Sequence, residues 1–254
     1  AFQNDPAERH AQLLALQDLI LEGDINQEFF DALIEKHNAE YGVRTRFRSS
    51  TNAEDVSGFN GAGLYTSRSG DPNDPDYPVE DAVRTVWASC WSRRAFEERE
   101  YYGINHLEIG MAMLVHRSFP DEEANGVAIT ANVYDTTGLE PGFYVNVQAG
   151  GESVVLPLAG VTSDQFIYYF DLPGQPISFI AQSNLVPAGE TVLTNAQTYT
   201  LGVALKAIHE YFYEAYGDQS FYGMDVEFKF DGEPGEEPQL YVKQARPYPG
   251  WGDQ

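Results

Sequence analysis

The order in which helical and strand-like segments follow one another constrains the fold of this chain most. Residues 8–41 carry Leu and Phe at helical spacing and predict two helices, with a break at Gly23-Asp24. Residues 79–102 and 194–216 predict further helices, the second with Asn195 as a candidate cap. Apolar runs of strand length lie at 43–48, 111–117, 126–132, several places between 144 and 170, 224–230 and 240–246. Because strands and helices do not alternate as in βαβ units, the pattern favours the α+β class over a doubly wound fold.

The composition indicates an ordered chain with an acidic surface. Of 254 residues 43% are hydrophobic, and 16 Tyr and 15 Phe supply aromatic side chains that disordered chains lack. The formal net charge of −24 repels nucleic acid and anionic lipid, so neither is expected as a partner. We interpret the acidity as a solvated surface, with binding of a basic partner as the alternative. The single Cys90 lies among apolar helical positions and is expected in the core, and a cytoplasmic protein is predicted.

Two carboxylates alternate with apolar residues in the segment 224–230. Successive side chains of a strand point to opposite faces, so Asp225 and Glu227 share one face. Carboxylate oxygens on a rigid strand are ligands that Mg²⁺ prefers, with waters and substrate phosphates completing its coordination. The alternative is the solvated side of an ordinary amphipathic strand. The alternation alone leaves both interpretations open.

The last predicted strand departs from simple alternation. Gln244 and Arg246 lie in phase with Leu240 and Val242, on the face that should be apolar. Polar groups on an inward face suggest a lined cavity, because local rules tend to break where function intervenes. Fraying of the strand before Pro247 is the other explanation, and the segment itself does not distinguish the two.

A loop rich in small polar residues follows the predicted strand 43–48, which ends at Arg48. A guanidinium beside hydroxyl groups and exposed backbone N–H groups matches the oxygens of a phosphate. An ordinary turn is the alternative interpretation. The segment Gly150-Gly151-Glu152 is a weaker candidate of the same kind. The loop residues concerned are Ser49, Ser50, Thr51, Asn52, Gly58, Gly61 and Gly63.

The other charged and titratable residues are interpreted as structural. Four arginines between residues 84 and 99 lie near Glu97 and Glu98 and are expected to form surface ion pairs. The five histidines show no spacing typical of metal ligands and no Ser or Cys nucleophile motif beside them. His209 lies among aromatic residues of a predicted helix and is expected to be a packed residue.

Several distinctive blocks follow one another along the chain. They are Phe47-Arg48-Ser49-Ser50-Thr51-Asn52-Ala53-Glu54-Asp55, Phe59-Asn60-Gly61-Ala62-Gly63, Val86-Trp87-Ala88-Ser89 with Arg93-Arg94-Ala95, residues 111–117, 126–132 and 151–152, Asp225-Val226-Glu227-Phe228, and residues 240–247. In this order they resemble the nucleotide-binding domain of the phosphoenolpyruvate synthase, pyruvate phosphate dikinase and glucan water dikinase group. The resemblance covers about residues 10–248, and the ordered set is more specific than any single block.

The resemblance implies an ATP-grasp-like α+β fold, in which a mixed or antiparallel sheet is flanked by helices. It also implies ATP and Mg²⁺ as cofactors. Carried over position by position, it makes Arg48 and Arg246 phosphate ligands with a catalytic role, and Ser49 and Ser50 nucleotide-binding neighbours of Arg48. Phosphoryl transfer depends mainly on such charge neutralisation and positioning.

The same carry-over assigns the metal and the base. Glu227 and Gln244 are implied to bind the Mg²⁺, with Asp225 close by and in contact with the nucleotide. The adenine is implied to lie against the strand 111–116. Its residues expected at the base are Met113, Val115 and His116, the last of which replaces the Gln usual in the family.

One feature of the family is absent from this sequence. The family normally opens with a Gly-Gly-Lys segment whose Lys contacts the nucleotide phosphates, and residues 1–47 contain nothing similar. We expect residues 1–43 to be an N-terminal helical segment and residues 44–254 an ATP-grasp-like domain, in a fragment of a larger protein or a degenerate relative. The larger protein would be a kinase or dikinase that phosphorylates a histidine on a separate domain and passes the group to a further acceptor-binding domain. The isolated chain is expected to bind Mg·ATP weakly and not to turn over. The alternative is a non-catalytic nucleotide-binding or structural module that keeps the fold.

Overall fold

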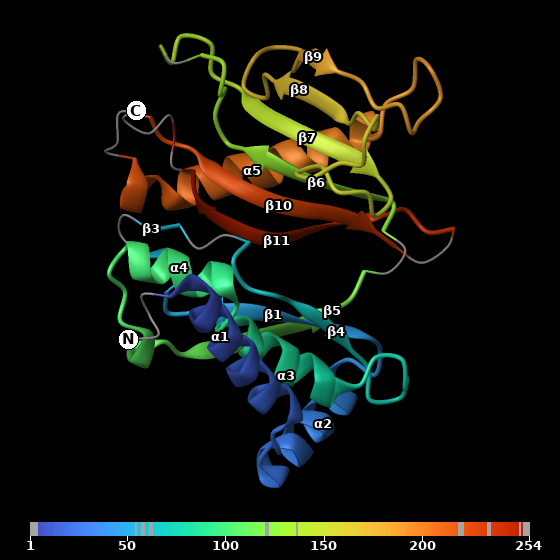
Figure 1. Ribbon diagram of the computed structural model, residues 1–254. Helices are drawn as coiled ribbons and strands as arrows, with labels where there is room; N and C mark the ends of the chain where they lie inside the picture. The colour runs from blue at the N-terminus through green and yellow to red at the C-terminus, as the bar shows by residue number, and fades with distance from the viewer. Residues whose placement is uncertain are drawn as a thin grey trace. The chain divides into compact units, whose positions relative to one another are not determined.

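The computed structural model describes residues 5–53, 55–56, 59–60, 63–119, 122–135, 137–217, 221–232, 235–248 and 250. The chain divides into two compact units, Ala1–Ser118 and Phe119–Gln254, each of which combines helices with antiparallel strands (Figure 1). The expected α+β class with antiparallel pairing is therefore confirmed. Among the helices of the described ranges, none is both long and apolar enough to cross a membrane. The domain division expected at residue 43 stays a prediction.

The first unit contains a three-stranded antiparallel sheet in the order β4-β1-β5. These strands are β1 (Thr45–Thr51), β4 (Arg68–Gly70) and β5 (Met111–Arg117), and β5 has the bounds expected from the sequence. The strand expected at 43–48 instead continues to Thr51, into the segment predicted as a loop. A short hairpin of β2 (Asp55–Val56) and β3 (Phe59–Asn60) follows.

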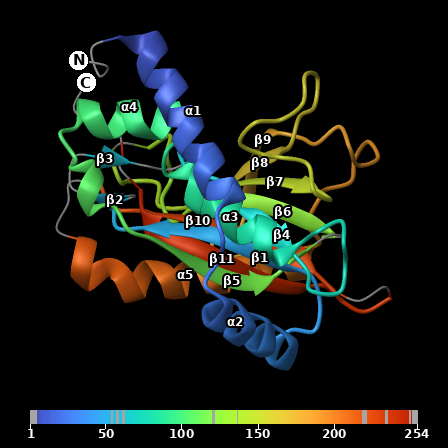
Figure 2. The same ribbon diagram turned by 60° about the horizontal axis from the view of Figure 1, so that its bottom comes forward.

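Helices cover one face of this sheet. Phe47 of β1 is fully buried there, and it packs with residues of α2 (Gln27–Glu40) and α3 (Val79–Ser89). The first helix, α1 (Pro6–Glu22), lies along α3 in both views (Figure 1, Figure 2). Since side chains of a strand alternate, Arg46 and Arg48 point to the other face, away from α2 and α3.

The helix predicted over 79–102 is two helices. The first, α3, ends at Ser89, and α4 (Arg93–Tyr101) begins after Ser92, whose side chain accepts a hydrogen bond from the Ala95 N–H at 3.2 Å. Serine is a favoured N-cap because its oxygen satisfies a backbone donor that has no partner within the helix. A 3₁₀ turn, His106–Glu108, follows α4. Cys90, in the break, is buried as expected.

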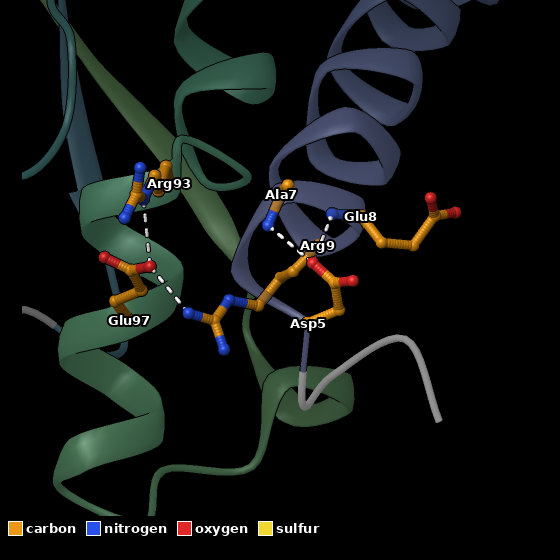
Figure 3. A network of polar contacts seen from close by, with 6 residues as sticks. All are labelled: Asp5, Ala7, Glu8, Arg9, Arg93 and Glu97. Atoms are coloured by element: carbon orange, nitrogen blue, oxygen red, sulfur yellow. Dashed lines mark hydrogen bonds and ion pairs between the residues drawn. The ribbon is translucent and has the colours of Figure 1, made fainter.

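The expectation of surface ion pairs holds for Arg93 but is wrong for Arg99. Glu97 accepts from Arg93 at 2.9 Å and from Arg9 of α1 at 2.8 Å, and these contacts tie α1 to α4 (Figure 3). Asp5 caps α1 by accepting from the N–H groups of its first turn. Arg99, by contrast, is fully buried, and its guanidinium donates to the Cys90 carbonyl at 2.6 Å. A buried guanidinium must find acceptors inside the protein, here mainly a backbone oxygen.

The second unit is built on a six-stranded antiparallel sheet in the order β11-β10-β6-β7-β8-β9. Five of the strands lie in segments expected to form strands, whereas β9 was not predicted. One helix, α5 (Asn195–Tyr216), packs against β10 and β11, and its N-cap is Thr194 rather than the expected Asn195. The strands are β6 (Ala124–Ile129), β7 (Phe143–Ala149), β8 (Asp164–Tyr168), β9 (Ile177–Ala181), β10 (Met224–Asp231) and β11 (Gln239–Pro247).

The core of the second unit lies between this sheet and α5. Alternate residues of β10 are buried in it, namely Met224, Val226, Phe228 and Phe230. Gly126 of β6 makes room for this packing, since a Cβ atom there would lie 2.5 Å from the Phe228 ring. The remaining residues of β10, which carry its charges, therefore project from the face of the sheet opposite to α5.

Candidate functional site

A β-bulge between β10 and β11 explains the irregular pattern of the last strand. Glu227 pairs with Gln244, but the next residue, Phe228, pairs with Val242, so Lys243 is an inserted residue. One inserted residue exchanges the two faces of a strand. Leu240 and Val242 consequently lie on the core face of β10, and Gln244 on the face of the carboxylates. The bulge replaces both sequence-based explanations, a lined cavity and strand fraying.

The bulge brings four of the predicted site residues together on one face of the sheet. Asp225 lies opposite Arg246, and Glu227 lies opposite Gln244. Arg246 donates from both Nε and Nη2 to the Oδ2 atom of Asp225, at 3.0 and 2.9 Å. The side chain of Arg246 is 25% exposed and that of Asp225 is 21% exposed, so the ion pair is partly shielded from water. We call these four residues the carboxylate face.

The neighbouring part of the same sheet face is occupied by the protein itself. Asn125 of β6 donates to the carbonyls of Gly150 and Glu152, at 2.6 and 2.8 Å. Lys229 of β10 forms an ion pair with Glu122. The segment Gly150-Gly151-Glu152, a weak candidate for phosphate binding, thus has a structural role in which its carbonyls are hydrogen-bond acceptors.

On the first unit, β1 presents two arginines on the face turned away from α2 and α3. Arg46 lies opposite Ser69 of β4 and His116 of β5, and its Nη1 atom donates to the Ser69 Oγ atom at 3.3 Å. Burial, followed by the positive charges of Arg48 and Arg68, lowers the pKa of Arg46. The sequence-based argument did not single out Arg46, whereas Arg68 pairs with Phe47 and so lies on the helix side of the sheet. The spacing of Arg46 and Arg48 in a predicted strand was the available signal, since it places both on one face.

The structure divides the residues expected near phosphate and base between two faces of this small sheet. Ser50 and His116 share the face of Arg48, whereas Ser49, Met113 and Val115 are in phase with Phe47 on the helix side. Met113 and Val115 line an apolar pocket of about 250 Å³ together with Phe29, Leu33 and Trp87. His116 donates from Nδ1 to the Arg117 carbonyl at 2.6 Å. Their contacts with a nucleotide stay predictions.

Backbone groups of β5 offer a further means of contact. The Val115 carbonyl accepts from the Tyr41 hydroxyl at 2.9 Å, which shows that it points away from β1. Backbone groups alternate in direction along a strand, so those of Met113 also point to this outer edge. The outer edge of β5 therefore presents backbone groups of Met113 and Val115, of which the Val115 carbonyl is already bonded to Tyr41, while their side chains face the helices.

The sequence matches the family model described as pyruvate phosphate dikinase, AMP/ATP-binding domain, over residues 3–254. The chain belongs to this family. A phosphoenolpyruvate synthase of Aquifex aeolicus is 29% identical over 147 residues, which make up 56% of this chain and 16% of that protein. A probable phosphoenolpyruvate synthase of Methanothermobacter thermautotrophicus is 28% identical over 169 residues, which make up 64% of the chain and 24% of the relative. The chain thus spans at most about a quarter of the length of these two relatives.

Membership of this AMP/ATP-binding family bears on the carboxylate face. Glu227 and Gln244, which lie opposite each other on this face, carry a carboxylate and an amide oxygen, the kinds of oxygen that suit a hard cation. Such a pair fits Mg²⁺, which is often bound by one or two carboxylates and completed by waters and substrate phosphates. The described residues contain no group of three His, Cys, Asp or Glu side chains that could hold a metal without such help.

A separate cavity of about 280 Å³ in the second unit has His209 in its lining. The Thr130 hydroxyl accepts from the Met224 N–H at 2.9 Å and is hydrogen-bonded to His209 Nδ1 at 2.9 Å. Burial, followed by the charge of Lys206, lowers the pKa of His209. His209 is therefore a packed histidine, as expected from the sequence.

Proposed function

We propose that this AMP/ATP-binding domain holds Mg·ATP for phosphoryl transfer within a phosphotransferase similar to phosphoenolpyruvate synthase or pyruvate phosphate dikinase. The acceptor would be a histidine on another domain of a larger protein. The observation that carries the proposal is the carboxylate face, where a bulge places Glu227 and Gln244 beside the Asp225–Arg246 ion pair. The family assignment supplies the nucleotide.

Charge explains why these residue types suit a metal–nucleotide complex. The two carboxylates and one guanidinium give the carboxylate face a formal charge of about −1, which attracts a divalent cation before it attracts a phosphate. Bound Mg²⁺ would supply charge neutralisation for the phosphate oxygens. Asp225 holds the Arg246 guanidinium in place, and the remaining N–H groups of Arg246 can donate to a phosphoryl oxygen.

For the first unit, considered by itself, we propose the nucleotide contacts that follow. Arg48, with the neighbouring Ser49 and Ser50, would bind phosphate oxygens, and preorganised donors of this kind stabilise the charge that moves during phosphoryl transfer. The adenine would lie at the outer edge of β5, against the backbone of Met113 and Val115. His116 stands on the same sheet face as Arg48 and would contact the nucleotide from that side.

Titration of the chain with ATP, with and without Mg²⁺, tests the proposal. Glu227→Gln should abolish most of the increase in ATP affinity that Mg²⁺ causes, because it replaces the carboxylate by a neutral amide. Glu190→Gln, an exposed carboxylate in a loop of the same unit, is the matched control and should bind Mg·ATP like the unchanged chain. An unchanged Mg²⁺ dependence in Glu227→Gln would rule out the metal assignment.

A further inference from the structure

The cavity of about 280 Å³ in the second unit lies on the α5 side of the sheet, away from the carboxylate face. Its lining includes His209 of α5 and Thr130, which directly follows β6. Ile129 pairs with Asp225 and shares its face, so Thr130, the next residue, points to the opposite face. The contact between Thr130 and His209 agrees with this direction. The sheet therefore separates the cavity from the proposed metal ligands, and the cavity is not part of that site.

One ring nitrogen of His209 is available to a ligand. Its Nδ1 atom is bonded to the Thr130 hydroxyl, whereas its Nε2 atom makes no hydrogen bond with any described residue. The Thr130 oxygen accepts from the Met224 N–H and has a second lone pair, so it can also accept from an Nδ1–H group of His209. In that tautomer Nε2 is an acceptor. A ligand that carries N–H donors can therefore bond to it.

The charges around the cavity favour a cation over an anion. The charged side chains of the lining are three carboxylates and one ammonium group, those of Asp135, Glu140, Asp171 and Lys206. Lys206 already pairs with Asp171 at 2.8 Å and with Glu210 at 3.2 Å. The Glu140 carboxylate, by contrast, has no partner in the described part of the chain. An anion would be repelled by this lining, whereas a cation would be attracted to it.

Aromatic side chains supply the rest of the lining. The rings of Phe143 and Phe170 are stacked with their centroids 6.1 Å apart, and Phe221 and Tyr222 also line the cavity. Such rings pack against a ligand ring and attract an ammonium group to their faces. A volume of 280 Å³ equals the share of roughly nine water molecules, which suits a single ring with a short substituent.

We propose that this cavity binds a small primary amine that carries one aromatic ring. The ring packs against Phe143 and Phe170, and the ammonium group donates to His209 Nε2 in the field of the lining carboxylates, among them Glu140. The inference goes beyond the proposed function and does not rest on it, because the sheet separates the two sites.

A titration of the whole chain with phenethylamine, followed by NMR and without ATP or Mg²⁺, tests the proposal. We expect a dissociation constant on the order of 1 mM, which is typical of a ligand of this size. The neutral analogue 2-phenylethanol should bind roughly five- to tenfold more weakly, and the anion phenylacetate more weakly still. Amide shifts should include those of Gly138 and Gly142, which line the cavity.

Three variants locate the contacts. His209→Phe keeps a ring but removes the acceptor, and Glu140→Gln removes the carboxylate without its partners changing; they should weaken phenethylamine binding by roughly tenfold and three- to tenfold. Glu214→Gln, an exposed carboxylate of α5 outside the lining, is the control and should keep the affinity within about twofold. Because Glu140 is exposed, its variant should fold even if His209→Phe does not.

Three results would overturn the inference. They are no binding of phenethylamine well above 1 mM, phenylacetate binding as tight as that of the amine, and unchanged affinity in the Glu140→Gln and His209→Phe variants that fold. Amide shifts confined to residues outside the cavity would contradict it as well. Since neither nucleotide nor metal is present in the titration, its outcome leaves the proposed function untouched.

Discussion

Replacement of Arg246 by Ala separates a nucleotide-binding role from a structural one. Its guanidinium makes two hydrogen bonds to one oxygen of Asp225, and both side chains keep about a fifth to a quarter of their surface in water. Fully exposed ion pairs contribute about 0–1 kcal/mol, and breaking a buried one costs about 3–5 kcal/mol. For this intermediate burial we expect Arg246→Ala to lower the unfolding free energy of the second unit by about 1–2 kcal/mol, or its melting temperature by roughly 2–8 °C.

The expected effect on the nucleotide is larger than the effect on folding. Loss of an arginine that contacts phosphate should weaken Mg·ATP binding by roughly ten- to a hundredfold. In a phosphotransferase that contains this domain, phosphorylation should slow on the order of a thousandfold, or about 4 kcal/mol of transition-state stabilisation. Thermal melting and nucleotide titration on one preparation compare the two effects.

Two further variants complete this experiment. Lys206→Ala removes a cation from α5 that pairs with Asp171 and Glu210, and it should leave Mg·ATP affinity unchanged. Combining Arg246→Ala with Asp225→Ala measures the coupling energy of the ion pair, which we expect at about 1–2 kcal/mol. A fall in unfolding free energy of about 3–5 kcal/mol, with a proportionate loss of affinity, would refute the reasoning and make Arg246 a structural residue.

Two other predictions concern stability. His37 is buried, and its Nε2–H must donate to Thr45 because the Thr45 hydroxyl donates to the Gly70 carbonyl. Its Nδ1 atom has no hydrogen-bond partner among the described residues. Burial lowers the pKa of His37, partly offset by Asp71, so the unfolded chain binds the proton more readily. The unfolding free energy should therefore fall as pH drops through about 6.5, and His37→Gln should reduce this fall in urea titrations while exposed His10→Gln should not. Gly126→Ala should lower the unfolding free energy by about 2 kcal/mol or more, because its Cβ would lie 2.7 Å from the Asn146 carbonyl oxygen as well as against Phe228; a change below about 0.5 kcal/mol would contradict this packing.

The sequence predicted most elements because their hydrophobic periodicity was strong, and it failed where one residue changed the phase. Asp225 and Glu227 were placed on one face by simple alternation, and the β10–β11 register confirms this. The face of Gln244 was not predictable, since the insertion of Lys243 leaves no mark on composition or local propensity. Only the pairing of β11 with β10, which is a tertiary feature, defines it.

The break between α3 and α4 was missed for a different reason. Apolar residues such as Trp91 and Phe96 continue the helical spacing across it, while the capping signal is the single Ser92. Likewise, whether Met113 and Val115 share a face with Arg48 depends on the pairing of β5 with β1. In each unit, strand register decides which side chains share a face, and register follows from contacts between segments far apart in the sequence.

The most direct test of the proposed site is a crystal structure of the chain with Mn²⁺ and a non-hydrolysable ATP analogue, in which anomalous scattering locates the metal. We expect the metal about 2 Å from a carboxylate oxygen of Glu227 and from the amide oxygen of Gln244, with Arg246 donating to a phosphate. A metal held only by phosphates and water, with neither Glu227 nor Gln244 among its ligands, would contradict the proposed function.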